Sequence, residues 1–252
     1  MHEFPIWQLG PLQIDIATWT ALLVSVIVTF VVARLAVRNL SVDNPSKMQN
    51  FLEWAVDFVH NLIGSAMPLN RVKPFMSLGL TLIMFIFISN LLGLPFGIVT
   101  EPHHAYESLG ITKEMLEHGH VAIAWWKSPT ADISVTAGLA IIVFVIVHFL
   151  GLKQNKKHYL KHYFQPYPIF FPINVIETIS KPVTLALRLY ANIFAGEVLI
   201  STILMIGWLG TPFLIAWQGF SLFVGAIQAF LFTMLTMVYI SQAAIHDEAE
   251  HH

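Results

Sequence analysis

The chain contains no cysteine among its 252 residues, which excludes disulfide bonds, thiolate metal sites and cysteine nucleophiles. Charge is also scarce, because Asp, Glu, Lys and Arg make up 11% of the sequence, against roughly 25% in soluble domains. Hydrophobic residues reach 56%, so the composition predicts an all-α polytopic membrane protein. No segment repeats internally, which argues against the many transporter folds built from duplicated halves.

Apolar runs long enough to cross a bilayer, which takes about 20 residues, divide the sequence. We predict perpendicular spans at about 14–38, 74–97 and 132–152. Two longer apolar segments follow at about 169–207 and 211–245. Each is longer than one perpendicular crossing, so we expect a pair of long, strongly tilted membrane helices.

Residues 46–64, between the first two spans, carry apolar side chains at three- and four-residue spacing. This spacing is typical of an amphipathic helix, which we place on the membrane surface. Ser46 followed by Gln49 predicts a capping box at its start. With this helix, residues 1–252 form a single membrane domain.

Lysine and arginine residues predict the orientation of the chain. Five lie from the C-terminal end of the first span to the start of the second (Arg34, Arg38, Lys47, Arg71 and Lys73) and four follow the third, whereas the loop at about 98–131 holds two. Cytoplasmic loops carry an excess of these residues. The loop is therefore expected to be external, with the N-terminus outside and the C-terminus in the cytoplasm.

The 85 residues from 162 to 246 contain four charged side chains, all in the first long apolar segment: Glu177, Lys181, Arg188 and Glu197. An ionised side chain near the bilayer centre costs at least about 2.5 kcal/mol, so a chain that keeps four of them is expected to use them. Carboxyl groups in apolar surroundings exchange protons near neutral pH, whereas a guanidinium stays protonated. The segment therefore predicts two proton-handling positions separated by a permanent cation.

Helical geometry separates these groups. Glu177 and Arg188 are about 20° apart around the axis and so share a face, whereas Glu197 lies on the opposite side, about 13 Å beyond Arg188. Asn192 is four residues from Arg188 and is its neighbour. Two structural alternatives stay open: Glu177 and Lys181 form an interfacial ion pair, or Arg188 and Glu197 form a buried structural pair.

The last apolar segment carries a stripe of residues on one helical face: Ser221, Gly225, Gln228 and Phe232. Gln228 is the one amide between residues 219 and 240. A Gln in a membrane helix usually bonds to a partner helix, so we expect Gln228 to serve as a hydrogen-bond acceptor for Arg188.

Around these residues the sequence resembles subunit a of the F-type ATP synthase, in the strings SKPVTLALRLYANIFAGE, IQAFLFTMLTMVYIS, SNLLGLPFG and PTADISVT. The resemblance covers nearly the whole chain. It implies a stationary, non-catalytic subunit that offers two offset half-channels to the carboxylates of a rotating c-subunit ring. It also implies a bacterial plasma membrane, a b-subunit peripheral stalk and the remaining synthase subunits as partners, and neither cofactor, metal nor nucleic acid.

Site roles follow from the same resemblance. Arg188 would face the ring with Asn192 and Gln228 as support, Glu197 would belong to the outer half-channel, and Glu177 would serve the inner one.

Three further residues are assigned to the outer half-channel: Ser221, Asn90 and Asp132. Asp132 could equally cap the following helix. Some members of the family carry a histidine at the position of Ser221, and because serine does not titrate, a Glu–His relay is absent here.

Two functions from other classes remain as alternatives. One is a self-contained proton-coupled secondary transporter. The other is a membrane di-iron oxidase built on His148, His158 and His162, although one HxxxH pair in a basic loop is a weak metal signal. The histidines of the external loop are expected to be solvated: His103, His104, His118 and His120.

Overall fold

The computed structural model describes residues 4–9, 12–93, 99–100, 123–164 and 167–244. The predicted all-α polytopic fold is confirmed. Five stretches are long and apolar enough to cross a membrane: Ile16–Ala36, Lys73–Gly93, Ile133–Gln154, Phe171–Leu204 and Gly207–Ala243.

The α-helices are α1 (Ile16–Ala36), α2 (Lys47–Ala66), α3 (Met76–Gly93), α5 (Ile133–His162), α6 (Phe171–Leu204) and α7 (Thr211–Ala244). Short 3-10 turns join them: η1 (Leu69–Arg71), η2 (Lys73–Phe75), η4 (Pro129–Ala131), η5 (Pro168–Phe170) and η6 (Gly207–Gly210). Two antiparallel hairpins, absent from the sequence prediction, pair β1 (Ile6–Leu9) with β2 (Leu12–Asp15) and β3 (Val99–Thr100) with β4 (Ile123–Ala124).

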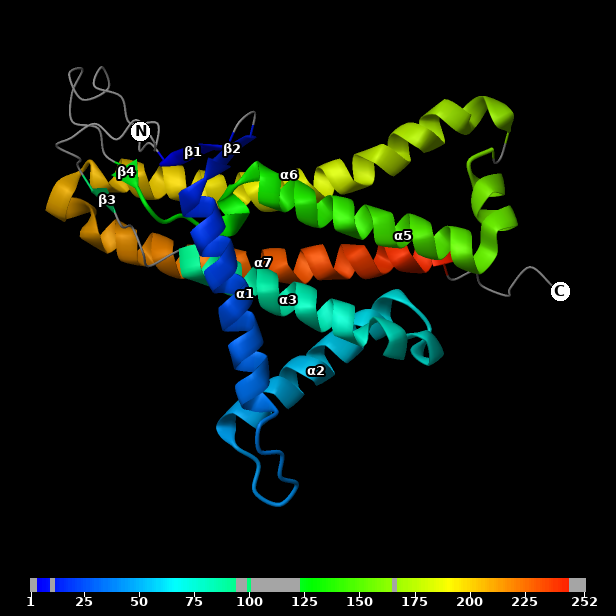
Figure 1. Cartoon of the computed structure of the whole chain (residues 1–252), viewed down its shortest axis with the longest axis horizontal. Coiled ribbons are helices and arrows are strands. Elements are labelled where there is room, and N and C mark those ends of the chain that lie inside the picture. Colours follow the sequence, from blue (N-terminus) through cyan, green and yellow to red (C-terminus); the bar gives the residue numbers. More distant parts are fainter. Residues whose placement is uncertain (1–3, 10–11, 94–98, 101–122, 165–166, 245–252) are drawn as a thin grey trace.

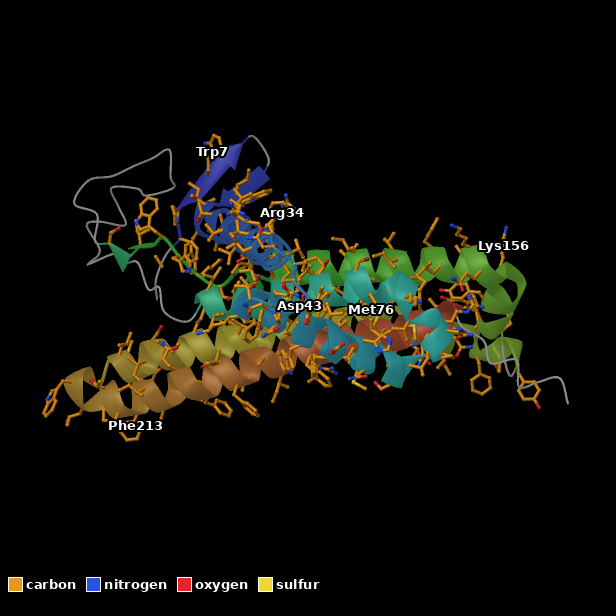
Figure 2. The ribbon with its side chains drawn as sticks, turned by 90° about the horizontal axis from the view of Figure 1, so that it is seen from below. Trp7, Arg34, Asp43, Met76, Lys156 and Phe213 are labelled. Carbon is orange, nitrogen blue, oxygen red and sulfur yellow. The ribbon has the colours of Figure 1, made fainter. Side chains whose placement is uncertain are left out.

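Helices α5, α6 and α7 run side by side, with α3 packed on α7 and α1 crossing their common direction (Figure 1). The ends of α6 and α7 project together beyond the other helices, and the chain reverses there at Gly207. Its φ of 71° lies in the left-handed region that glycine adopts without a steric penalty. Figure 2 shows Phe213, near this reversal, and Lys156, on α5, at opposite ends of the molecule. The tilt of the α6–α7 pair relative to a bilayer remains a prediction.

Side-chain caps start two of the helices. Asp15 accepts a hydrogen bond from the Thr18 N–H at 3.2 Å, and Ser46 accepts one from the Gln49 N–H at 3.1 Å. The predicted reciprocal bond from the Gln49 side chain to Ser46 is replaced, because that amide bonds the N–H and C=O of Ser41, at 3.1 and 2.9 Å. The chain before α2 folds back and offers both a donor and an acceptor to one side chain.

Two apolar clusters form the core. The first joins α2, α3 and α7, and its members are Val59, Leu62, Ile63, Met67, Val72, Phe75, Met237 and Ile240. The second joins α3, α5, α6 and α7, and its members are Leu82, Ile86, Val143, Leu185, Leu189, Ala229 and Phe232. The second cluster fixes α6 and α7 against α3, which positions the polar residues described next.

We expect Ile86→Ala to destabilise the protein by about 2–5 kcal/mol, because it opens a cavity in the second cluster, where Ile86 is fully buried. Ile141→Ala is the matched control, since that side chain on α5 is 58% exposed. Thermal unfolding of the purified subunit in detergent measures the difference. Equal midpoints for the two variants would contradict the assigned packing.

Candidate functional site

A cavity of about 280 Å³ lies between α3, α6, α7 and the segment that precedes η4. Its polar lining comes from these separate parts of the chain: Asn90, Ser128, Asn192, Glu197 and Ser221. Four of these five are predicted site residues, and Ser128 is new. The rest of the lining is mostly apolar. The volume has room for several water molecules, each of which occupies roughly 30 Å³ in the liquid, and these five side chains could bind them.

Glu197 meets a backbone donor at the cavity wall. Its Oε1 accepts a hydrogen bond from the Ser128 N–H at 3.2 Å. Ser128 is itself buried, and its Oγ donates to the Ser89 carbonyl at 3.2 Å and lies 2.8 Å from Thr130 Oγ1. The donor to Glu197 is thus held by a second layer of hydrogen bonds.

Asn90 links three elements beside the cavity. Its Nδ2 donates to the Gly225 carbonyl on α7 at 2.9 Å, and its Oδ1 accepts from Thr130 Oγ1 on η4 at 2.6 Å. Ser221, across the cavity, has a buried Oγ with no hydrogen-bond partner among the described residues. A buried hydroxyl without a partner is costly, and water in the cavity would supply one.

Arg188 is exposed on α6 and does not line the cavity. The neighbouring positions on its face of the helix are also exposed, and they carry short side chains: Thr184, Ala191 and Ala195. No acidic side chain pairs with Arg188 in the described part of the chain. The face therefore presents one guanidinium within a strip of small residues.

Gln228 is buried on α7, and its predicted hydrogen bond to Arg188 does not occur between these two described residues. The contact of Trp217 Nε1 with the Gly196 carbonyl, at 3.3 Å, sets the register of the antiparallel helices. This register places Gln228 within about one helical turn of the level of Arg188. The stripe on α7 points inward instead, since Gly225 accepts from Asn90 on α3.

Glu177 lies far from the cavity, since 20 residues of α6 separate it from Glu197, or about 30 Å of helix. It forms an ion pair with Lys181 at 3.2 Å, which is the structural alternative that its sequence spacing left open. Both side chains are partly exposed, and Lys181 Nζ also donates to Gln242 Oε1 on α7 at 3.5 Å. Pairs of this kind contribute little to stability.

Asp132 caps α5, as one of its two predicted roles required, because its Oδ1 accepts from the Ser134 N–H at 2.8 Å. Its Oδ2 lies 2.9 Å from Lys127 Nζ, which also lies 2.6 Å from Asp15 Oδ2. Burial would lower the pKa of Lys127, but the hydrogen bonds and charges of the two carboxylates raise it overall. Burial would raise the pKa of Asp132, but Lys127 and Ser134 hold it below its usual value.

Sequence reasoning missed Lys127, Ser128 and Asp15. A usable sequence signal exists for Asp15, because it immediately precedes an apolar span, which is the position of a helix cap. Asp132 occupies the same position before its own span. The Ser128 donor is a backbone N–H, which every residue except proline carries, so no sequence pattern marks it.

The described histidine of the proposed metal set is engaged elsewhere. His148 Nδ1 lies 2.8 Å from the Phe144 carbonyl, and its Nε2 lies 3.4 Å from the Tyr163 hydroxyl. The described residues contain no group of three side chains suited to a metal. The other histidine side chains of the sequence predictions lie outside the described ones: His103, His104, His118, His120, His158 and His162.

Five apolar helices, three of which border a cavity that the half-buried Glu197 lines, define a multi-pass membrane protein that carries an ionisable group in its interior. The family described as ATP synthase A chain matches residues 17–241. ATP synthase subunit a of Anoxybacillus flavithermus is 44% identical over 256 residues, covering 98% of this chain and 99% of that protein. The subunits a of Bacillus velezensis and Bacillus subtilis are each 42% identical over 263 residues, with the same coverage.

The chain belongs to the ATP synthase subunit a family. It is thus the proton-translocating stator subunit of an F-type ATP synthase, and other subunits of that complex are its partners. The family match gives no support to the alternative of a self-contained transporter.

We expect Asp132→Asn to lower stability at neutral pH by about 1–2 kcal/mol, because it removes one charge from the Lys127 cluster while asparagine still caps the helix. The folded pKa of Asp132 is depressed, so its contribution is present above its ordinary pKa of 3.8 and is lost as the pH falls through the folded value. Thermal unfolding of the purified subunit across a pH series measures this.

The gap between wild type and Asp132→Asn should close below about pH 4. Asp43→Asn is the control, since Asp43 is exposed in the loop before α2. A gap that stays constant down to the lowest pH would show that the Asp132 charge contributes nothing.

Proposed function

We propose that the chain forms two offset half-channels beside a c-subunit ring, with Arg188 as the fixed charge between them. One observation carries the proposal: Arg188 is exposed on an apolar helix long enough to cross a bilayer, and it has no acidic partner within the described part of the chain. Contact with lipid would cost at least about 2.5 kcal/mol. A carboxylate on another subunit would remove that cost, and the short side chains around Arg188 allow a partner helix to approach.

The fixed charge of Arg188 has two electrostatic effects in this scheme. An ionised ring carboxylate is attracted to Arg188, while a proton cannot pass a guanidinium that stays charged. Asn192, one turn along α6, and Gln228, at a similar level on α7, support this position. Protons would therefore reach the inner side by riding on the ring and not by direct flow.

Glu197 and its cavity would form the outer half-channel. The carboxyl exchanges protons with water in the cavity, while Asn90 and Ser221 line the path. Asp132 lies next to this region through Lys127 and Ser128 and would polarise the entrance. Because Ser221 cannot titrate, water takes the place that imidazole would otherwise fill.

Glu177 would serve the inner half-channel. It lies at the opposite end of α6 from the α6–α7 reversal, where it is exposed. The lysine-rich end of α5 lies near the start of α6 (Figure 1), and the positive-inside rule assigns that end to the cytoplasm. In a bacterial plasma membrane the N-terminus would then be external and the C-terminus cytoplasmic. A b-subunit stalk would also contact the subunit there.

Affinity purification of the tagged subunit from mildly solubilised membranes tests the assembly. We expect it to retain a ring of small, two-helix proteolipids that carry a mid-membrane carboxyl. Proton-coupled solute transport by the subunit alone would instead favour the transporter.

We expect Arg188→Ala to abolish coupled ATP synthesis while allowing passive proton leak through the assembled membrane sector, because the barrier between the half-channels is gone. ATP-driven pumping and passive proton uptake in reconstituted vesicles measure the two effects. Arg38→Ala, at an exposed arginine beyond α1, is the control. Normal coupled pumping by Arg188→Ala would refute the assignment.

We expect Glu197→Gln to lower proton-driven ATP synthesis by about 100-fold or more, since the amide keeps size and hydrogen bonding but cannot exchange protons. Glu197→Asp should retain partial activity. Adding Ser221→His to Glu197→Gln should restore some flux, because imidazole titrates near neutrality. Asp57→Asn on α2 is the matched control, and wild-type rates in Glu197→Gln at every pH would remove Glu197 from the path.

A further inference from the structure

Lys127 forms a charged cluster that the half-channel scheme does not use. Its side chain is 10% exposed, and its Nζ lies 2.6 Å from Asp15 Oδ2 and 2.9 Å from Asp132 Oδ2. The Phe4 ring covers the ammonium at 4.2 Å. Thr18 Oγ1 joins the two carboxylates, with Oδ2 distances of 3.0 Å to Asp15 and 3.2 Å to Asp132.

This cluster ties the start of α1 to the start of α5. Asp15 caps α1 through Thr18, and Asp132 caps α5 through Ser134. Lys127 lies between two carboxylates that helix caps already hold in place. Its own backbone is consequently fixed relative to both helices, and the next residue in the chain is Ser128.

Residues 126–130, which we call the docking segment, are also attached to the end of α3. Trp126 Nε1 donates to the Leu92 carbonyl at 2.9 Å, and Ser128 Oγ donates to the Ser89 carbonyl at 3.2 Å. The end of α3 and the docking segment are in close contact at Gly93, because a Cβ there would overlap the Cβ of Ser128. The backbone of Ser128 is therefore held against α3 by close approach as well as by hydrogen bonds.

Among the residues that the structure describes, Lys127 is the charged side chain that the chain places next to the Ser128 donor of Glu197. Lys127 immediately precedes Ser128, whose N–H bonds the Glu197 carboxyl, and its own ammonium is paired with Asp15 and Asp132. The α3 and α7 sides contribute neutral groups among the described residues: Asn90, Trp217 and Ser221. An N–H donor and a nearby ammonium both favour the ionised form of a carboxyl.

We infer that Lys127 is a positioning residue of the outer half-channel: anchored by Asp15 and Asp132, it holds the Ser128 N–H on Glu197 and so sets the outer pH at which Glu197 exchanges protons. This inference rests on the proposed role of Glu197. No bond other than the exchanging O–H of Glu197 is made or broken. Lys127 stays protonated throughout and acts through the docking segment.

The test uses the complete synthase, reconstituted in vesicles, with ATP synthesis measured against outer pH at fixed inner pH and fixed potential. Lys127→Met removes the ammonium at similar length. We expect its half-maximal outer pH to rise by about half a unit or more, because the groups that favour the ionised carboxyl are weakened. The maximal rate should fall as well.

Two lysine variants frame this result. Lys127→Arg keeps the charge and should restore most of the wild-type pH profile. Lys156→Met is the matched control, since Lys156 is exposed at the far end of the molecule from the hairpin that carries Trp7 (Figure 2). A profile shifted equally by both Met variants would overturn the inference.

Gly93→Ala provides a second route to the same displacement without altering any charge, because the added Cβ pushes Ser128 away. We expect a shift in the same direction as for Lys127→Met. If Lys127→Met fails to assemble, Gly93→Ala decides the matter alone. Reduced assembly with a wild-type pH profile in this variant would mean that the docking segment is structural only, and would overturn the inference.

Glu197→Gln in the same series distinguishes a failure of the proposed role of Glu197 from a failure of the proposed role of Lys127. If Glu197→Gln synthesises ATP at the wild-type rate, the proposed function fails. If Glu197→Gln is inactive while Lys127→Met and Gly93→Ala keep the wild-type profile, the inference fails and the proposed function stands.

Discussion

The cost of an uncompensated charge in hydrocarbon determines where the ionisable groups of this subunit lie. Lys127 is buried, and two carboxylates and an aromatic ring surround its ammonium. Glu197 lies at a cavity with other polar side chains and accepts a backbone hydrogen bond. Arg188 is the exception, because its compensation is missing from the described chain. This missing compensation is the basis for proposing that the Arg188 face meets another subunit.

The cavity keeps its shape because polar contacts, and not only apolar ones, hold its walls. Asn90 connects α3 to α7 and to η4, with both ends of its amide used. In a membrane interior the competition from water for such bonds is weak, so bonds that link three elements through one side chain favour one arrangement of the helices. The Ser221 hydroxyl at the same cavity has no partner among the described residues, which favours water as a component of the site.

Much of this was accessible from the sequence. Long apolar runs predict the helices, and the cluster from Glu177 to Glu197 places most of the proposed site residues on α6. Spacing alone failed for Gln228, because a helical wheel shows which residues share a face but not which neighbouring helix that face meets. It also failed for the Ser128 donor, since a main-chain N–H bears no residue signature. The short hairpins fell below the length at which alternation can be recognised.

The contact between Thr18 and Asp132 spans 114 positions of the chain. During synthesis the first helix would enter the membrane long before Asp132 is made. In the proposed orientation, Thr18 could meet Asp132 only after the loop at about 98–131 is translocated. Formation of the proposed outer half-channel is therefore a late event in biogenesis. A subunit truncated before α5 could insert its early helices, yet it would lack Glu197, which lies on α6. In the proposed scheme such an incomplete chain would not open a proton leak in the membrane.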